Sequence, residues 1–196
     1  EGMTRRPRLL TRLFSSLLAG LPFAAQSPPV ATLVIAVAGD PVSPVPTLWR
    51  NDQGNRELSD LLFLRLADLG PGLSTIDEKS FVPRLARRWV RRDALTLVFE
   101  LDPRAHWQDG RPVTAHDVVF SMDRARNPAL SPQTSTLLRR VRSATAEAER
   151  RLVVRFSESY PEQFYDATYH VPPLPSHLLE SIPPESLATS PFVSRP

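Results

Sequence analysis

Apolar and polar residues alternate most regularly in the middle of the chain. The run at 95–101 (LTLVFEL) places Leu or Phe at every second position, which predicts a half-buried strand. Two later apolar runs, at 141–148 and 152–156, flank a polar turn at 149–151 and predict a strand pair. A further run at 31–38 (ATLVIAVA) is continuously apolar and predicts a buried strand.

Other segments carry apolar residues at helical spacing. The stretch 56–69 places its leucines and a phenylalanine on one helical face. The stretch 131–142 also predicts a helix, with Ser131 as its N-cap ahead of Pro132. We expect a third, short helix at 161–167. A proline-rich, extended crossover is expected to follow it, at 171–175.

The segment 81–127 combines several of these signals. We expect it to form a helix, a strand, a tight turn and a second, capped helix. Asp109-Gly110 predicts the turn, because glycine accepts a positive φ. Thr114 and Asp117 predict a capping box, in which the hydroxyl caps a free helix amide and the carboxylate sits in the first turn. All of these residues are expected to build a scaffold.

Charge and composition constrain the class of function. The 196 residues include 24 basic and 21 acidic side chains, for a formal net charge of +3. Four arginines and one glutamate lie in the first 25 residues, which leaves 20 basic and 20 acidic residues in the rest of the chain. A nearly neutral body lacks the basic footprint that phosphate binding requires, so we expect no nucleic-acid partner.

The first 25 residues have the pattern of an export signal. Four arginines at 5–12 precede an apolar region at 13–25 that is too short to span a membrane. We expect cleavage near Ala25, with an uncleaved anchor as the alternative. The chain has no cysteine, which excludes disulfides, thiolate metal sites and a lipid-modified cysteine. The expected product is a soluble periplasmic protein that is not a lipoprotein.

Metal-dependent hydrolysis is the main competing chemistry. His106, Asp109, His116 and Asp117 lie close together in the sequence and are residue types that can bind zinc. However, they lack the H-E-x-x-H spacing of a zinc hydrolase, and adjacent residues such as 116 and 117 point to different helix faces. We therefore expect no metal and no cofactor, and keep a secreted metal-dependent hydrolase as the alternative function.

Two further features invite an enzymatic or ligand-stacking role. Ser176 precedes His177, but no G-x-S-x-G elbow accompanies them, so a structural role is expected for the pair. Trp49 and Trp107 could stack on a ligand, although buried aromatic residues are the ordinary case.

An ordered set of positions between 83 and 118 gives the most specific signal. The set comprises Pro83, Leu85, Ala86, Trp89, Trp107, Asp109, Gly110, Pro112, Thr114, Ala115, Asp117 and Val118. In order and spacing it resembles the signature of the bacterial extracellular solute-binding proteins of family 5, the oligopeptide and dipeptide receptors of ABC importers. Pro175, His177 and Leu178 resemble the Pro-x-His-Leu segment of the same family.

The resemblance implies an α/β fold of the type II periplasmic-binding-protein kind. It comprises part of the first lobe and a small added domain, and the second lobe is missing. By analogy, 31–50 begins the first lobe, 51–169 forms the small α/β domain, and 170–196 returns to the first lobe. Because strand-end loops of α/β lobes face the cleft, the loop at 40–50 is the expected ligand contact. Its candidate ligand-binding residues are Asp40, Pro41, Thr47 and Trp49.

The same resemblance implies a binding protein rather than an enzyme. We expect a monomer that captures peptides or similar small solutes and delivers them to ABC permease subunits in the inner membrane. Nickel-binding and oligosaccharide-binding members of the family remain open, as does a relative that uses the fold for signalling. Because a cleft receptor needs both lobes, residues 26–196 alone are expected to bind peptide weakly or not at all.

Overall fold

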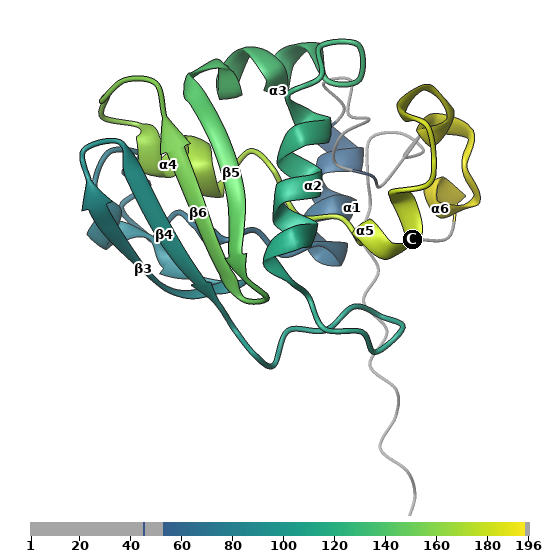
Figure 1. The fold of residues 1–196 in the computed structure, drawn as a ribbon, viewed down its shortest axis with the longest axis horizontal. Helices are drawn as coiled ribbons and strands as arrows, with labels where there is room; N and C mark the ends of the chain where they lie inside the picture. The colour runs from purple at the N-terminus through teal and green to yellow at the C-terminus, as the bar shows by residue number, and fades with distance from the viewer. Residues whose placement is uncertain (1–44, 46–52, 195–196) are drawn as a thin grey trace, which may run out of the picture. The chain divides into compact units, whose positions relative to one another are not determined.

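The computed structural model describes Val45 and residues 53–194 (Figure 1). These residues belong to one compact unit, Val37–Pro196. The strand expected at 31–38 lies outside the described residues. No helix among the described residues is long and apolar enough to cross a membrane.

A four-stranded antiparallel sheet forms the centre of the described chain. Its strands are β3 (Ala86–Asp93), β4 (Thr96–Leu101), β5 (Val141–Ala148) and β6 (Arg151–Phe156), in the spatial order β3-β4-β6-β5. β5 and β6 are joined by a tight turn and pair antiparallel, which confirms the expected strand pair. A separate two-stranded pair joins β1 (Ala67–Asp68) to β2 (Val82–Pro83).

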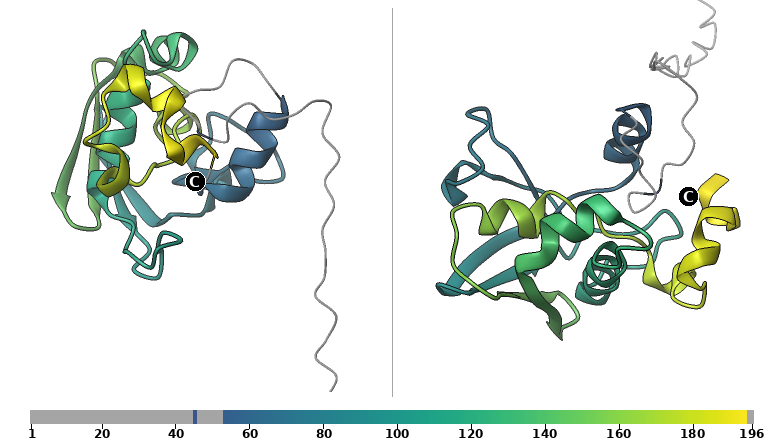
Figure 2. Two further views of the ribbon diagram at one scale, coloured as in Figure 1. Left: turned by 90° about the vertical axis from the view of Figure 1, so that its right-hand side faces the viewer. Right: turned by 90° about the horizontal axis from the view of Figure 1, so that it is seen from above.

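Two helices lie against one face of the sheet, α2 (Ala115–Ala125) and α4 (Gln163–Thr168) (Figures 1 and 2). The main core lies between them and the strands, where Phe99, Met122 and Phe164 are at most 1% exposed. β4 therefore takes the strand structure that its alternating pattern predicts.

The expectation that β4 is half-buried is wrong. Val98 and its neighbour Val153 on β6 belong to the opposite face, yet they are only 2% and 0% exposed. β4 and β6 are the central strands, so both edges of each are covered. Arg151 and Glu100 pair at 3.2 Å beside the two valines, and arginine stems shield apolar surface on such a face.

The helix expected at the start of segment 81–127 is also wrong, because β2 and β3 occupy this stretch. Trp89 and Arg91 point to the inner face, where Trp89 packs against Phe164 with ring centroids 4.8 Å apart. Pairing of β3 with β4 along its whole length thus overrides the local helical preference.

The first helix, α1 (Gln53–Leu62), begins and ends earlier than the range 56–69. The chain after it runs extended because its backbone pairs with the segment before β3. The amide of Ala86 donates to the Leu66 carbonyl at 2.9 Å, and that of Leu85 donates to the Arg65 carbonyl at 3.0 Å.

The helix expected at 131–142 forms as α3 (Pro132–Leu137) followed by the 3-10 turn η3 (Leu138–Arg140). Ser131 is its N-cap residue by position, but its side chain makes no capping hydrogen bond. The short helix expected at 161–167 is α4, and the crossover at 171–175 has no regular structure, as predicted.

The chain beyond this crossover contributes to a second, smaller core. This part of the chain contains α5 (Ser176–Leu179), the 3-10 helix η4 (Pro184–Thr189) and α6 (Pro191–Ser194). The buried residues of this second core are Val45, Phe63, Leu174, Leu179, Leu187 and Phe192. The partly buried side chain of Trp107 packs against both cores.

Candidate functional site

The turn before α2 has the geometry that its sequence predicts. Gly110 has a φ of +85°, and its amide donates to the Trp107 carbonyl at 2.9 Å. The Trp107 amide donates in turn to the Arg111 carbonyl at 2.8 Å, which closes the turn. This closure holds the indole of Trp107 at the base of α2.

The predicted capping box is present at the start of α2. The Thr114 hydroxyl accepts the Asp117 amide at 3.4 Å, and Asp117 Oδ2 accepts the Thr114 amide at 2.8 Å. Oδ2 also accepts the Thr114 hydroxyl at 3.0 Å and the Trp107 indole N–H at 3.3 Å. One carboxylate oxygen therefore fixes both the helix start and the preceding turn.

The second oxygen of Asp117 binds a segment almost sixty residues further along the chain. Oδ1 accepts the Ser176 amide at 2.9 Å and the Ser176 hydroxyl at 2.6 Å. Asp117 is 3% exposed and Ser176 is 5% exposed. A buried carboxylate is costly unless hydrogen bonds compensate its desolvation, and here five donors do so.

Two more contacts support the same connection. Ser121, one turn along α2, accepts the Leu174 amide at 2.7 Å and donates to the Asp117 carbonyl at 2.6 Å. His177 Nε2 lies 2.7 Å from Asp109 Oδ2 in the turn. We call this set of contacts the signature joint. Its members are Trp107, Asp109, Thr114, Asp117 and Ser121 on one side and Leu174, Ser176 and His177 on the other.

The joint also influences ionisation at its exposed edge. The pKa of Asp109 is lowered, first by the hydrogen bond from the Arg111 amide and then by the hydrogen bond with His177. Asp109 is therefore held as a carboxylate, which keeps it an acceptor for both groups.

The metal-site alternative gains no support from the described residues. His106 Nδ1 lies 2.8 Å from the Arg104 carbonyl, and His116 faces Glu180 at 3.5 Å. Asp117 uses its oxygens in the joint. Within Val45 and 53–194, no three His, Asp or Glu residues gather as metal ligands would.

Ser176 and His177 likewise do not form a nucleophile and base. The Ser176 hydroxyl donates to Asp117, whereas the His177 ring faces Asp109. Ser176 thus connects α5 to α2, and His177 connects it to the turn before α2.

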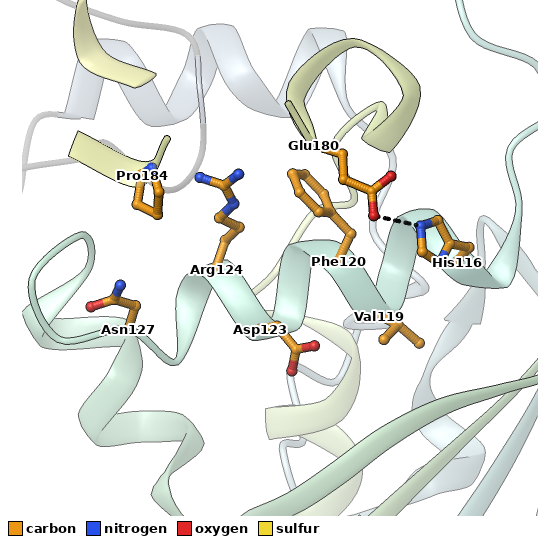
Figure 3. A pocket seen from close by; sticks show the side chains of 8 residues that line it. All are labelled: His116, Val119, Phe120, Asp123, Arg124, Asn127, Glu180 and Pro184. Atoms are coloured by element: carbon orange, nitrogen blue, oxygen red, sulfur yellow. Dashed lines mark ion pairs between the residues drawn. The ribbon is translucent and has the colours of Figure 1, made fainter. Parts of the chain in front are cut away.

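A small cavity of about 270 Å³ lies beside the joint, between α2 and the segment after α5 (Figure 3). It is lined by His116, Val119, Phe120, Asp123, Arg124, Asn127, Glu180 and Pro184. The guanidinium of Arg124 lies 4.9 Å from the centre of the Phe120 ring. It also donates to the carbonyls of Leu179 and Ile182 at 3.2 and 2.7 Å.

Arg124 is a contact that the sequence reasoning missed. Its side chain fastens the end of α5 to α2, as basic groups near a helix C-terminus do when they bind free carbonyls. The sequence places a basic residue in the last turn of an amphipathic helix, but it does not identify the carbonyls that this residue binds. Those partners lie 55 and 58 residues away.

The expected ligand-contact loop cannot be placed. Asp40, Pro41, Thr47 and Trp49 lie outside the described residues. Val45, in the same loop, is buried in the second core. Among the remaining signature positions, Leu85, Ala86, Ala115 and Val118 are at most 2% exposed and belong to the main core, whereas Pro83 and Pro112 are exposed.

The profile of the family "Bacterial extracellular solute-binding proteins, family 5 Middle" matches residues 80–194, more than half of the chain. The match begins just before β2 and includes the whole signature joint.

Individual proteins give the same result. An ABC transporter peptide-binding protein of Brucella ovis is 36% identical over 99 residues, which cover 50% of this chain and 18% of that protein. The periplasmic oligopeptide-binding protein OppA of Salmonella typhimurium is 40% identical over 72 residues, or 36% of this chain and 13% of that protein. The chain thus matches less than a fifth of the length of either relative.

The fold also matches solved structures. NikZ from Campylobacter jejuni, solved in complex with Ni(L-His), superimposes with a TM-score of 0.66 at 26% identity, covering 84% of this chain and 31% of that one. The mixed α/β fold is therefore that of type II periplasmic binding proteins, as the resemblance implied.

Proposed function

Because the chain belongs to the bacterial extracellular solute-binding proteins of family 5, we propose that it serves in a periplasmic receptor of an ABC importer. The receptor captures peptides and delivers them to a membrane permease without covalent chemistry. The observation that carries this proposal is the match over residues 80–194, supported by relatives that are named as peptide-binding proteins.

The proposed mechanism is capture by lobe closure. In this proposal, 31–50 starts the first lobe, 51–169 forms the added small domain, and 170–196 returns to the first lobe. Asp40, Pro41, Thr47 and Trp49 contribute to the ligand cleft. A second lobe completes the cleft, and ligand stabilises the closed state of the hinge.

The signature joint supports a specific part of this mechanism. Asp117 and Ser176 lie on opposite sides of the proposed boundary between the small domain and the first lobe, and their contact is buried. A buried, fully hydrogen-bonded connection resists shearing, so the small domain moves together with the first lobe while the other lobe closes. The receptor works as a monomer in the periplasm, after export directed by residues 1–25.

A panel of solutes tests the proposal. The complete gene product is heated with di-, tri- and pentapeptides, with a nickel–histidine complex, and with a mannose oligosaccharide, and its unfolding temperature is followed. A ligand that binds only the folded state raises this temperature. We expect peptides to raise it, and a peptide panel without effect would contradict the proposal.

A nickel-binding role is the second candidate, because NikZ was solved with Ni(L-His) and is 26% identical to this chain. The same panel separates the two candidates. A rise in unfolding temperature with nickel–histidine alone would replace peptide capture by capture of a metal complex.

A further inference from the structure

Asp109-Gly110 is the only Asp-Gly or Asn-Gly pair in the 196 residues of the chain. In this dipeptide aspartate rearranges to isoaspartate most readily, because glycine has no side chain to keep its nitrogen away from the neighbouring carboxyl group. The turn before α2 therefore contains a chemically labile bond, and its reactivity depends on the groups that surround the two residues.

The rearrangement passes through a succinimide. The Gly110 nitrogen forms a bond to the side-chain carbon Cγ of Asp109, and a carboxyl oxygen leaves as water with its own proton and the amide proton. One water molecule then reopens the ring. Attack at Cγ restores aspartate, whereas attack at the main-chain carbonyl carbon of Asp109 leaves Gly110 bonded through the side chain as isoaspartate. The reaction needs no oxidant and no cofactor.

Two contacts within the turn oppose the first step. The reaction consumes the amide proton of Gly110, and this N–H donates to the Trp107 carbonyl at 2.9 Å. It also requires a protonated carboxyl group, because a carboxylate oxygen is a poor leaving group. The Arg111 amide donates to Asp109 Oδ1 at 3.0 Å, and this bond, followed by the one with His177, lowers the pKa of Asp109. The turn thus slows the reaction through neighbours in sequence.

The contact with His177 differs because it comes from α5, 68 residues further along the chain. His177 Nε2 lies 2.7 Å from Asp109 Oδ2, and the His177 side chain is only 17% exposed. With Oδ1 held by the Arg111 amide and Oδ2 by His177, the carboxyl group is fixed in one orientation and ionised. Loss of the His177 contact frees one oxygen to turn and to take up a proton, and leaves the labile pair itself unchanged.

We propose that Asp109-Gly110 is a latent site of isoaspartate formation and that His177 keeps it unreactive. The site reacts when α5 leaves the turn, so the modification records opening of the signature joint. This chemistry is independent of the solute that the receptor carries.

Modification damages the joint that normally prevents it. Isoaspartate adds a carbon to the main chain of a turn in which Gly110 has a φ of +85°. The hydrogen bond from the Gly110 amide to the Trp107 carbonyl depends on the original chain length, so Trp107, which packs against both cores, loses its support. We expect the modified fraction to unfold at a lower temperature than the unmodified protein.

Ageing of the complete gene product tests the proposal. The wild-type protein and His177→Ala are kept folded at neutral pH and then digested with trypsin, which releases residues 105–124 as one peptide because the bond between Arg111 and Pro112 resists cleavage. Isoaspartate and aspartate have the same mass, so chromatography separates the two forms and fragmentation locates the change. We expect His177→Ala to isomerise about five-fold faster, the effect of losing one partly exposed hydrogen bond to a carboxylate.

Three further variants separate the hydrogen bond from other causes. His177→Gln retains a donor of similar reach and should age as slowly as the wild type. His116→Ala removes a side chain that is 57% exposed and faces Glu180 instead of the turn, so it should have no effect. Phe164→Leu lowers stability from the main core without touching the joint, and it controls for general unfolding.

Wild-type protein unfolded in guanidinium chloride gives the upper limit of the rate at position 109. Slow ageing of the folded wild type, fast ageing of the unfolded chain and an intermediate rate for His177→Ala are the expected results. Equal rates for the wild type and His177→Ala, equal acceleration by Phe164→Leu, a His177→Gln rate equal to that of His177→Ala, or no isoaspartate at 109 even in the unfolded chain would overturn the proposal.

Discussion

At the scale of single residues, Asp117 makes the most consequential contact in the joint. Its two oxygens accept donors from the turn, the helix start and the crossover. We expect Asp117→Asn to lower the free energy of unfolding by about 2–4 kcal/mol, because the amide replaces one acceptor oxygen by a donor that faces other donors. Urea denaturation measures the change.

Asp123→Asn provides the matched control on the same helix. That carboxylate is 63% exposed, and its ion pair with Arg126 is long at 3.8 Å. An effect below about 0.5 kcal/mol is expected there. Equal losses in the two variants would mean that the joint contributes no specific stability.

Gly110 tests the turn that positions Trp107. Its φ of +85° lies in the left-handed region, so Gly110→Ala should cost about 1–2 kcal/mol. Gly72→Ala is the control, because a Cβ there meets no atom within 4 Å and the backbone is not left-handed. Thermal unfolding of both variants measures the difference. Equal unfolding temperatures for Gly110→Ala and Gly72→Ala would contradict the turn geometry.

Asp102 predicts a defined pH dependence. Hydrogen bonds from the Arg104 side chain and then from the Arg104 amide lower the pKa of Asp102 from 3.8 to about 2. Folding thus favours the ionised carboxylate, whose contribution to stability is present above pH 3.8 and is lost as the pH falls to about 2. Unfolding temperatures measured from pH 5 to pH 2 should fall less steeply for Asp102→Asn, and an unchanged slope would refute this assignment.

At the scale of secondary-structure elements, the sequence correctly predicted the features that depend on interactions between residues close in sequence. The capping box of Thr114 and Asp117 and the turn at Gly110 involve neighbours in sequence, and both form as expected. β3 was mispredicted as a helix, because its conformation depends on pairing with β4 and on contact with Phe164. The burial of Val98 was missed because it depends on neighbours on both edges of a central strand.

Phe164 anchors α4 on the sheet. Its ring contacts Phe81, Trp89 and Phe99, with centroids 4.7, 4.8 and 5.8 Å away. Phe164→Ala should destabilise the protein by about 3–5 kcal/mol, because a fully buried ring leaves a cavity. Phe164→Leu fills most of that volume and should cost less, and urea denaturation that ranks the two in the opposite order would contradict this packing.

At the scale of the whole molecule, Trp107 packs against both cores, and the buried contact of Asp117 with Ser176 joins the start of α2 to α5. The sequence did not predict that Asp117 and Ser176 meet, because no spacing rule relates positions almost sixty residues apart. The contacts of Arg124 escaped prediction for the same reason. The ligand-contact loop stays a prediction, since Asp40 and Trp49 lie outside the described residues.

The measurement that tests the account most directly is calorimetric titration of a pentapeptide into the complete gene product and into residues 26–196. We expect the complete protein to bind with a Kd on the order of 1 μM, a binding free energy of about −8 kcal/mol. Residues 26–196 should bind at least about 100-fold more weakly, because in the proposed mechanism closure by a second lobe supplies much of the affinity. Equal affinity of the two, or no peptide binding by the complete protein, would contradict the account.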